Sequence, residues 1–136
     1  MMHRRSVTRM ITILVPLFVL ASAVTLTAKV KNISTKKAHE LIEERDGDSD
    51  FVILDVRTPE EFAEEHIENA VNIDFYADTF PDELDVLDRD KTYLIYCQSG
   101  DRSGSAARMM EGLGFQDAYN MKGGINIWRD DYPLVR

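Results

Sequence analysis

The chain has 136 residues, of which 44% are hydrophobic and 29% are charged. This length supports one domain with its own hydrophobic core and is too short for two domains of ordinary size. The composition and the formal net charge of −8 exclude a disordered chain and a membrane protein with several spans. Because an acidic surface repels phosphate groups, we expect neither nucleic acid nor anionic lipid as a partner.

The amino-terminal residues 1–23 have the pattern of a secretory signal peptide. The basic residues 1–9 precede an apolar, uncharged stretch at 10–20, and small residues follow at 21–23. The apolar stretch is shorter than the roughly 20 residues that a membrane-spanning helix needs. We therefore expect cleavage, a periplasmic or secreted protein and no stable membrane association afterwards; an uncleaved membrane anchor is the alternative.

Residues 24–33 are polar and are expected to form a linker, so the domain should occupy residues 34–136. We expect helices at about residues 35–45, 59–65, 103–113 and 124–130, and a loop followed by a helix within residues 76–87. Strands are expected at residues 51–54, 70–73, 92–96 and 118–121. Strands that alternate with helices predict an α/β fold with a mostly parallel sheet covered on both faces. In such sheets, sites form where the strands end, in the loops that lead to helices.

Two segments carry the clearest local signals. The apolar run 51–54 is too short for a helix and fits a strand buried on both faces, which ends at Asp55. Thr58, Pro59 and Glu61 then supply an N-cap, a proline at the first helical position and the acidic member of a capping box. A short helix is therefore expected directly after the first buried strand.

Cys97 is the single cysteine, so it cannot form a disulfide within the chain. A lone cysteine usually packs as a small apolar residue, but here the small and polar residues 97–103 lead from a strand into a helix. Such a turn can point amide groups toward an anion at the positive end of the helix. Because helix amino termini and nearby arginines lower a thiol pKa, we expect Cys97 to be a nucleophile, with Arg102 binding an anion or the loop carbonyls.

A cysteine in an anion-binding loop allows either phosphoryl transfer or sulfur transfer. Cysteine phosphatases have one residue more between Cys and Arg than the four that separate Cys97 from Arg102. The tighter ring suits a sulfane sulfur on Cys97 better than a tetrahedral phosphate. Tyr96 also stands where phosphatases usually have a histidine. A phosphatase or arsenate reductase is therefore the less favoured alternative.

Four segments resemble signatures of the rhodanese family, in the family's order: residues 51–62, 66–73, 97–103 and 123–128. The chain thus resembles a single-domain, exported rhodanese of the thiosulfate sulfurtransferase-like type. The resemblance implies a rhodanese-like α/β fold with a parallel sheet of about five strands and helices on both faces. It also implies a sulfurtransferase that works through a persulfide on Cys97 and that needs no cofactor and no metal.

The resemblance also assigns roles around Cys97. The donor, a small sulfur-containing anion such as thiosulfate, is expected to bind the loop residues Gln98, Ser99, Gly100, Asp101, Arg102 and Ser103. The acceptor is expected to be cyanide or a thiol. Asp55 is expected to support the site by receiving hydrogen bonds from neighbouring loops, while Arg57 either adds positive potential or pairs with Glu60 or Glu61.

Asp101 places a carboxylate inside the expected anion-binding loop. It should weaken the binding of a dianion such as thiosulfate unless it faces solvent or pairs with Arg102. Asn69 stands at a turn where the family often has Gly or Ala. A non-enzymatic persulfide carrier or sulfur-binding module would use the same loop, so the sequence leaves that alternative open, as it does the oligomeric state.

Overall fold

The computed structural model describes residues 30–136, so the predicted signal peptide and residues 24–29 lie outside the described residues. Within residues 30–136 the elements are, in chain order, β1 (Lys31–Ile33), α1 (Thr35–Glu44), β2 (Phe51–Asp55), α2 (Pro59–Glu64), β3 (Val71–Asn72), α3 (Phe80–Asp85), β4 (Thr92–Tyr96), α4 (Asp101–Gly112), β5 (Asp117–Met121) and α5 (Gly124–Asp131). The strands form one five-stranded sheet in the order β1-β5-β4-β2-β3, and every neighbouring pair is parallel. The predicted parallel sheet is therefore confirmed. None of the helices in this part of the chain is long and apolar enough to cross a membrane.

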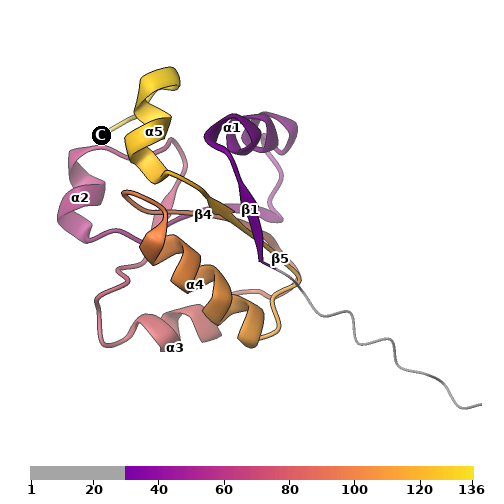
Figure 1. Cartoon of the computed structure of the whole chain (residues 1–136). Helices are drawn as coiled ribbons and strands as arrows, with labels where there is room; N and C mark the ends of the chain where they lie inside the picture. The colour runs from indigo at the N-terminus through magenta and orange to yellow at the C-terminus, as the bar shows by residue number, and fades with distance from the viewer. Residues whose placement is uncertain (1–29) are drawn as a thin grey trace, which may run out of the picture.

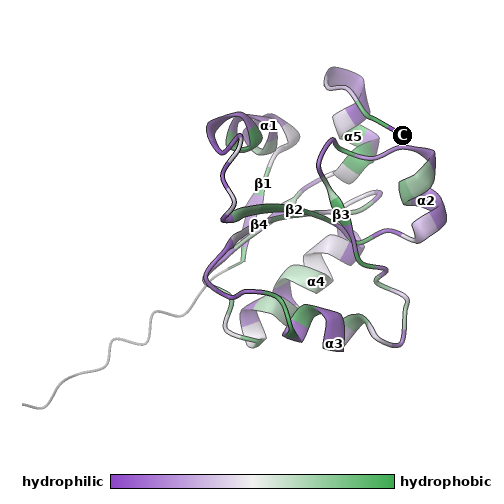
Figure 2. Cartoon of the chain, turned by 180° about the vertical axis from the view of Figure 1, so that it is seen from behind, coloured by the Kyte–Doolittle hydropathy of each residue, from purple (hydrophilic) through white to green (hydrophobic). Residues whose placement is uncertain are grey.

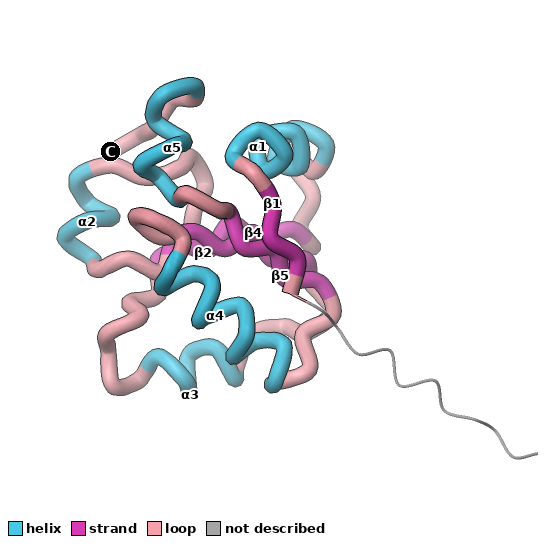
Figure 3. The backbone as a smooth tube through the Cα atoms, viewed as in Figure 1, coloured by secondary structure: helices cyan, strands magenta, loops and turns pink. Residues whose placement is uncertain are grey.

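Helices cover both faces of the sheet. Figures 1 and 3 show α1 and α5 on one face and α3 and α4 on the other, with α2 beside the end of the sheet. All residues of β4 are buried, and their side chains alternate between two cores: Tyr93 and Ile95 pack toward α3 and α4, and Leu94 and Tyr96 toward α1 and α5. In Figure 2 the inner strand β2 is strongly hydrophobic, whereas the helices carry mixed colours. This pattern fits a sheet buried on both faces.

The segment Lys31–Ile33 corrects the expected linker, because it forms the edge strand β1. It pairs with β5, and side chains add to the backbone pairing: Lys31 Nζ lies 3.0 Å from Asp117 Oδ1, and Asn120 Nδ2 donates to Asn32 Oδ1 at 2.8 Å. An edge strand with exposed side chains needs no apolar run, so its polar sequence resembles a linker.

The local signals for α2 are confirmed in the structure. Thr58 Oγ1 accepts a hydrogen bond from the Glu61 amide at 3.3 Å, and the Glu61 carboxylate accepts one from the Thr58 amide at 2.8 Å, which completes the capping box. Asn69 has a φ of 64°. Asparagine tolerates this left-handed conformation better than most side chains do, so the turn forms without a glycine.

The register of the sheet brings the functional loops to one edge. Asp55 at the end of β2 pairs with Tyr96 at the end of β4, and the Val56 amide donates to the Tyr96 carbonyl at 3.0 Å. β5 lies on the other side of β4 and ends at Met121. The loops after β2, β4 and β5 therefore meet around Cys97, as expected for a parallel sheet.

We predict that Leu94→Ala lowers the free energy of unfolding by about 3 kcal/mol, because it removes a fully buried side chain from a packed core. Val86, which is 83% exposed, supplies the control: Val86→Ala should change the same quantity by less than about 0.5 kcal/mol. Urea unfolding of the three proteins measures both values. Equal losses in the two variants would contradict the assignment of β4 to the centre of the core.

Candidate active site

Cys97 is fully buried at the point where β4 ends and the loop to α4 begins. Its Sγ accepts hydrogen bonds from the Gly100 amide at 3.1 Å and from the Ser103 hydroxyl at 3.4 Å. The chain therefore wraps around the sulfur within one short turn formed by residues 97–103.

The surroundings of the sulfur favour its ionised form. Burial by itself raises the pKa of the Cys97 thiol, but hydrogen bonds from the Ser103 hydroxyl and from the amides of Ser103, Gly100 and Ser99 lower it by more, so the pKa lies below its usual value. Because the thiolate is the reactive form of cysteine, these donors favour the form in which Cys97 could act as a nucleophile.

The first turn of α5 is hydrogen-bonded to the backbone of the Cys97 loop. The Ile125 amide donates to the Cys97 carbonyl at 2.9 Å, and the Asn126 amide donates to the Gln98 carbonyl at 3.1 Å. The Gln98 side chain also donates from Nε2 to Asn126 Oδ1 at 2.5 Å, so it is turned toward α5. These contacts hold the loop carbonyls toward α5 and leave the loop amides for the sulfur.

The close contact between α5 and the Cys97 loop depends on two glycines. A Cβ atom at Gly124, whose φ is 59°, would lie 2.5 Å from the carbonyl oxygens of both Cys97 and Gln98. Gly100 precedes α4 with a φ of 105°, and a Cβ atom there would lie 3.2 Å from the Gly123 amide nitrogen. Larger side chains would force the loop and α5 apart.

Arg57 pairs with Asp55 and not with Glu60 or Glu61, which corrects one of its two expected roles. The other, added positive potential, is offset by the Asp55 carboxylate. Arg57 Nη2 lies 2.8 Å from Asp55 Oδ2, both side chains are almost fully buried, and the Arg57 amide donates to Asp55 Oδ1 at 2.8 Å. Arg57 Nη2 also donates to the Glu65 carbonyl at 2.6 Å. The pair therefore braces the loop after β2, and Asp55 neutralises the charge of Arg57.

Arg102 likewise has a carboxylate partner. Its Nη1 and Nη2 donate to the two carboxylate oxygens of Glu61, each at 2.9 Å, and its guanidinium lies 5.3 Å from the centre of the Tyr76 ring. The hydrogen bond from Arg102 is the main cause that lowers the pKa of Glu61 to about 2. Asp101 is exposed and receives a hydrogen bond from the Ser99 hydroxyl at 3.5 Å. The structure thus pairs Arg102 with Glu61, and neither with Asp101 nor with the loop carbonyls.

Three residues at the site have roles that the sequence analysis did not assign. Glu61 was recognised as a helix-capping residue, Gly124 as part of a closing motif, and Tyr76 as part of a loop. The partners of Glu61 and Gly124 lie far away in sequence, so no local pattern points to these contacts. Only the capping box gave a partial signal, because it orients Glu61 at the start of α2.

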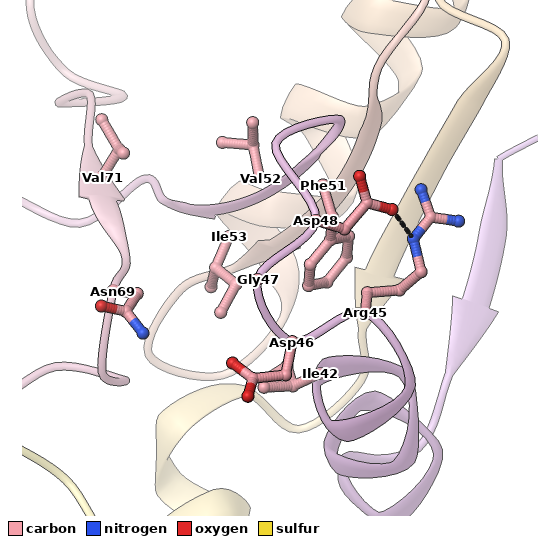
Figure 4. A pocket seen from close by; sticks show the side chains of 10 residues that line it. All are labelled: Ile42, Arg45, Asp46, Gly47, Asp48, Phe51, Val52, Ile53, Asn69 and Val71. Carbon is pink, nitrogen blue, oxygen red and sulfur yellow. Dashed lines mark ion pairs between the residues drawn. The ribbon is translucent and has the colours of Figure 1, made fainter.

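A separate pocket of about 390 Å³ lies at the opposite end of β2 (Figure 4). It is lined by the end of α1 and the following turn, by the first three residues of β2, and by Asn69 and Val71. At its side Arg45 Nε lies 2.7 Å from Asp48 Oδ2. None of the site residues predicted from the sequence lines this pocket, so it is separate from the loop that carries Cys97.

Comparisons with known proteins agree with this geometry. A family model described as a rhodanese-like domain matches residues 34–131. The thiosulfate sulfurtransferase GlpE of Coxiella burnetii is 34% identical over 103 residues, which cover 76% of this chain and 91% of that protein. GlpE of Pseudomonas putida is 35% identical over 106 residues, with coverages of 78% and 91%. The crystal structure of a rhodanese-like domain protein from Staphylococcus aureus superposes with a TM-score of 0.63 at 36% identity, over 77% of this chain and 96% of that one.

We predict that Gly124→Ala lowers the rate at which iodoacetamide alkylates Cys97 at pH 7 by at least about tenfold, because the new Cβ pushes the loop away from α5 and misplaces the amides around the sulfur. Gly47→Ala is the matched control: Gly47 also has a positive φ, of 74°, but no atom lies within 4 Å of its added Cβ. That variant should be destabilised by about 1 kcal/mol through backbone strain alone and keep the wild-type alkylation rate. Equal alkylation rates in both variants would contradict the view that the contact with α5 positions the amides around the sulfur.

Ser103→Ala should raise the thiol pKa of Cys97, because it removes the hydroxyl that donates to the sulfur. The midpoint of alkylation against pH should move upward, and the rate at pH 7 should fall by roughly tenfold, as expected for the loss of a hydrogen bond to a charged group. Ser105→Ala, two residues further along α4, serves as the control and should leave the midpoint in place. An unchanged midpoint in Ser103→Ala would show that the backbone amides alone set the thiol pKa.

Proposed function

Because the chain belongs to the rhodanese family and is a rhodanese-type sulfurtransferase, we propose that Cys97 carries the transferred sulfur as a persulfide. The donor is a small anion with a sulfane sulfur such as thiosulfate, which appears in the names of the GlpE relatives. The acceptor is a thiol or cyanide.

The observation that carries this proposal is the ring of hydrogen-bond donors around the sulfur. Cys97 Sγ accepts hydrogen bonds from the Gly100 amide and the Ser103 hydroxyl, and these donors lower the thiol pKa despite full burial. In a persulfide the negative charge lies on the outer sulfur, about 2 Å from Sγ, and we propose that amides of the same loop, such as that of Gly100, stabilise it there. Such a ring suits a small, singly charged sulfur.

The reaction proceeds in two displacements at sulfur. In the first, the Cys97 thiolate attacks the outer sulfur of thiosulfate; a new S–S bond forms, and sulfite leaves with the electron pair of the broken S–S bond. In the second, an acceptor thiolate or cyanide attacks the outer sulfur of the persulfide, and the Cys97 thiolate leaves. The donors around Sγ stabilise the thiolate at the beginning and at the end of the cycle.

We further propose that residues 1–23 act as an export signal, so that the sulfur is handled in the periplasm or outside the cell. The support is the sequence pattern alone, a basic stretch followed by an apolar one and by small residues. In an oxidising compartment structural cysteines normally come in pairs, so the single Cys97 fits a free, reactive thiol there and not a structural disulfide.

We predict that wild-type protein incubated with thiosulfate gains about 32 Da, one sulfur atom held as a persulfide, and that Cys97→Ser gains nothing. With cyanide present, wild type should form thiocyanate continuously and Cys97→Ser only at the background rate. Intact-mass spectrometry and a thiocyanate assay measure the two results. Because the chain has one cysteine, no other thiol can carry the sulfur.

Two other results would change the assignment. A mass gain on Cys97 without thiocyanate turnover would identify a persulfide carrier that passes sulfur to a protein partner. Hydrolysis of an aryl phosphate by wild type, abolished in Cys97→Ser and without any mass gain, would contradict sulfur transfer and favour a phosphatase.

A further inference from the structure

The guanidinium of Arg102 is held from two sides at the rim of the Cys97 loop. Glu61 of α2 binds it through two hydrogen bonds of 2.9 Å, and the Tyr76 ring lies 5.3 Å away. Both members of the ion pair are shielded, since the Arg102 side chain is 15% exposed and that of Glu61 32%. A bidentate, partly buried pair of this kind is stronger than an ordinary surface ion pair.

Arg102 is also close enough to Cys97 for their charges to interact. The pKa of Arg102 is raised chiefly by its hydrogen bond to Glu61, and the charge of Cys97 contributes as well. The cation in the loop therefore lies within electrostatic range of the reacting sulfur but is already neutralised.

The two arginines closest to the Cys97 loop both have carboxylate partners. Asp55 neutralises Arg57, and Glu61 neutralises Arg102. Asp101 adds an exposed carboxylate inside the loop. The attraction for an anionic donor thus comes mainly from backbone amides and the Ser103 hydroxyl. Neither Arg57 nor Arg102 is left unpaired to balance a second negative charge.

We propose that Glu61 is a specificity-determining residue, which by holding Arg102 makes the site prefer an organic sulfane-sulfur donor with a single negative charge over the dianion thiosulfate. This inference rests on the proposed function. Glu61 acts through Arg102 and does not touch the reacting atoms, so it is a positioning residue.

Three physical reasons support this preference. A dianion must approach the carboxylate of Glu61, or draw Arg102 away and leave Glu61 without its partner. Glu61 stays ionised at neutral pH, because its pKa of about 2 is far below 7. The Tyr76 ring, whose residue is 68% exposed, offers an apolar surface to an organic group.

Bonds and charges balance when such a donor transfers its sulfur to Cys97. A singly charged thiosulfonate, R–SO₂–S⁻, gives its outer sulfur to the Cys97 thiolate, so that one S–S bond forms and another breaks. The sulfinate R–SO₂⁻ leaves with the electron pair of the broken bond. The total charge is −2 before and after the step, whereas the same step with thiosulfate gathers three negative charges at the site.

The test compares two donors that differ by one charge, methanethiosulfonate and thiosulfate, with cyanide as the common acceptor. For wild type we expect a higher kcat/KM with methanethiosulfonate. Glu61→Gln keeps an oxygen that can cap α2 but releases Arg102 from its charged partner. In this variant the KM for thiosulfate should fall by about tenfold, since Arg102 gains a charge-assisted hydrogen bond to the dianion.

Methanethiosulfonate should respond much less to Glu61→Gln, by under about threefold in KM. Glu60→Gln removes a charge from the adjacent, exposed position of α2 that does not contact Arg102, and should change neither constant. Because the expected result is a gain for one donor, a folding defect cannot produce it.

The outcomes separate this inference from the function on which it rests. Equal changes with both donors, no change with thiosulfate, or the same effect in Glu60→Gln would each overturn the role of Glu61 while leaving sulfur transfer in place. If neither donor puts sulfur on Cys97 in the wild-type protein, the proposed function itself fails.

Discussion

Two backbone hydrogen bonds from the first turn of α5 hold the loop that carries Cys97. Ile125 and Asn126 donate to the carbonyls of Cys97 and Gln98, and only a glycine at position 124 lets the two segments come this close. Since these carbonyls point to α5, the amides further along the loop are available to the sulfur. The last helix of the domain therefore determines how the loop after β4 presents its donors.

A buried thiol would ordinarily stay protonated, because burial disfavours its charged form. In this protein the Ser103 hydroxyl and the amides of Ser99, Gly100 and Ser103 outweigh the burial of Cys97 and lower its pKa. The O–H and N–H groups that the fold fixes around the sulfur lower the thiol pKa without a cation in direct contact with Sγ. The site can thus hold a thiolate and still exclude bulk water.

Arg57 and Arg102 carry positive charge near the Cys97 loop, and they also connect parts of the structure. One is buried against Asp55 and braces the loop after β2, and the other, Arg102, joins α4 to α2 through Glu61. Glu61 has two functions here, because the same carboxylate caps α2 through Thr58 and neutralises Arg102. A change at this one residue would therefore alter the charge beside Cys97 while the sheet and its cores remain as they are.

The sequence by itself determined the features that depend on neighbouring residues: the buried strands β2 and β4, the capped start of α2, and Cys97 at the end of a strand. These features could be predicted because apolar runs, helix caps and loop composition depend on residues only a few positions apart in the sequence. The tertiary structure alone decided that Lys31–Ile33 is an edge strand, that Arg102 pairs with Glu61, and that Gly124 closes on the Cys97 loop. Each of these contacts joins segments that are distant along the chain, and a flexible or polar side chain takes the partner that the packed helices and strands bring within reach.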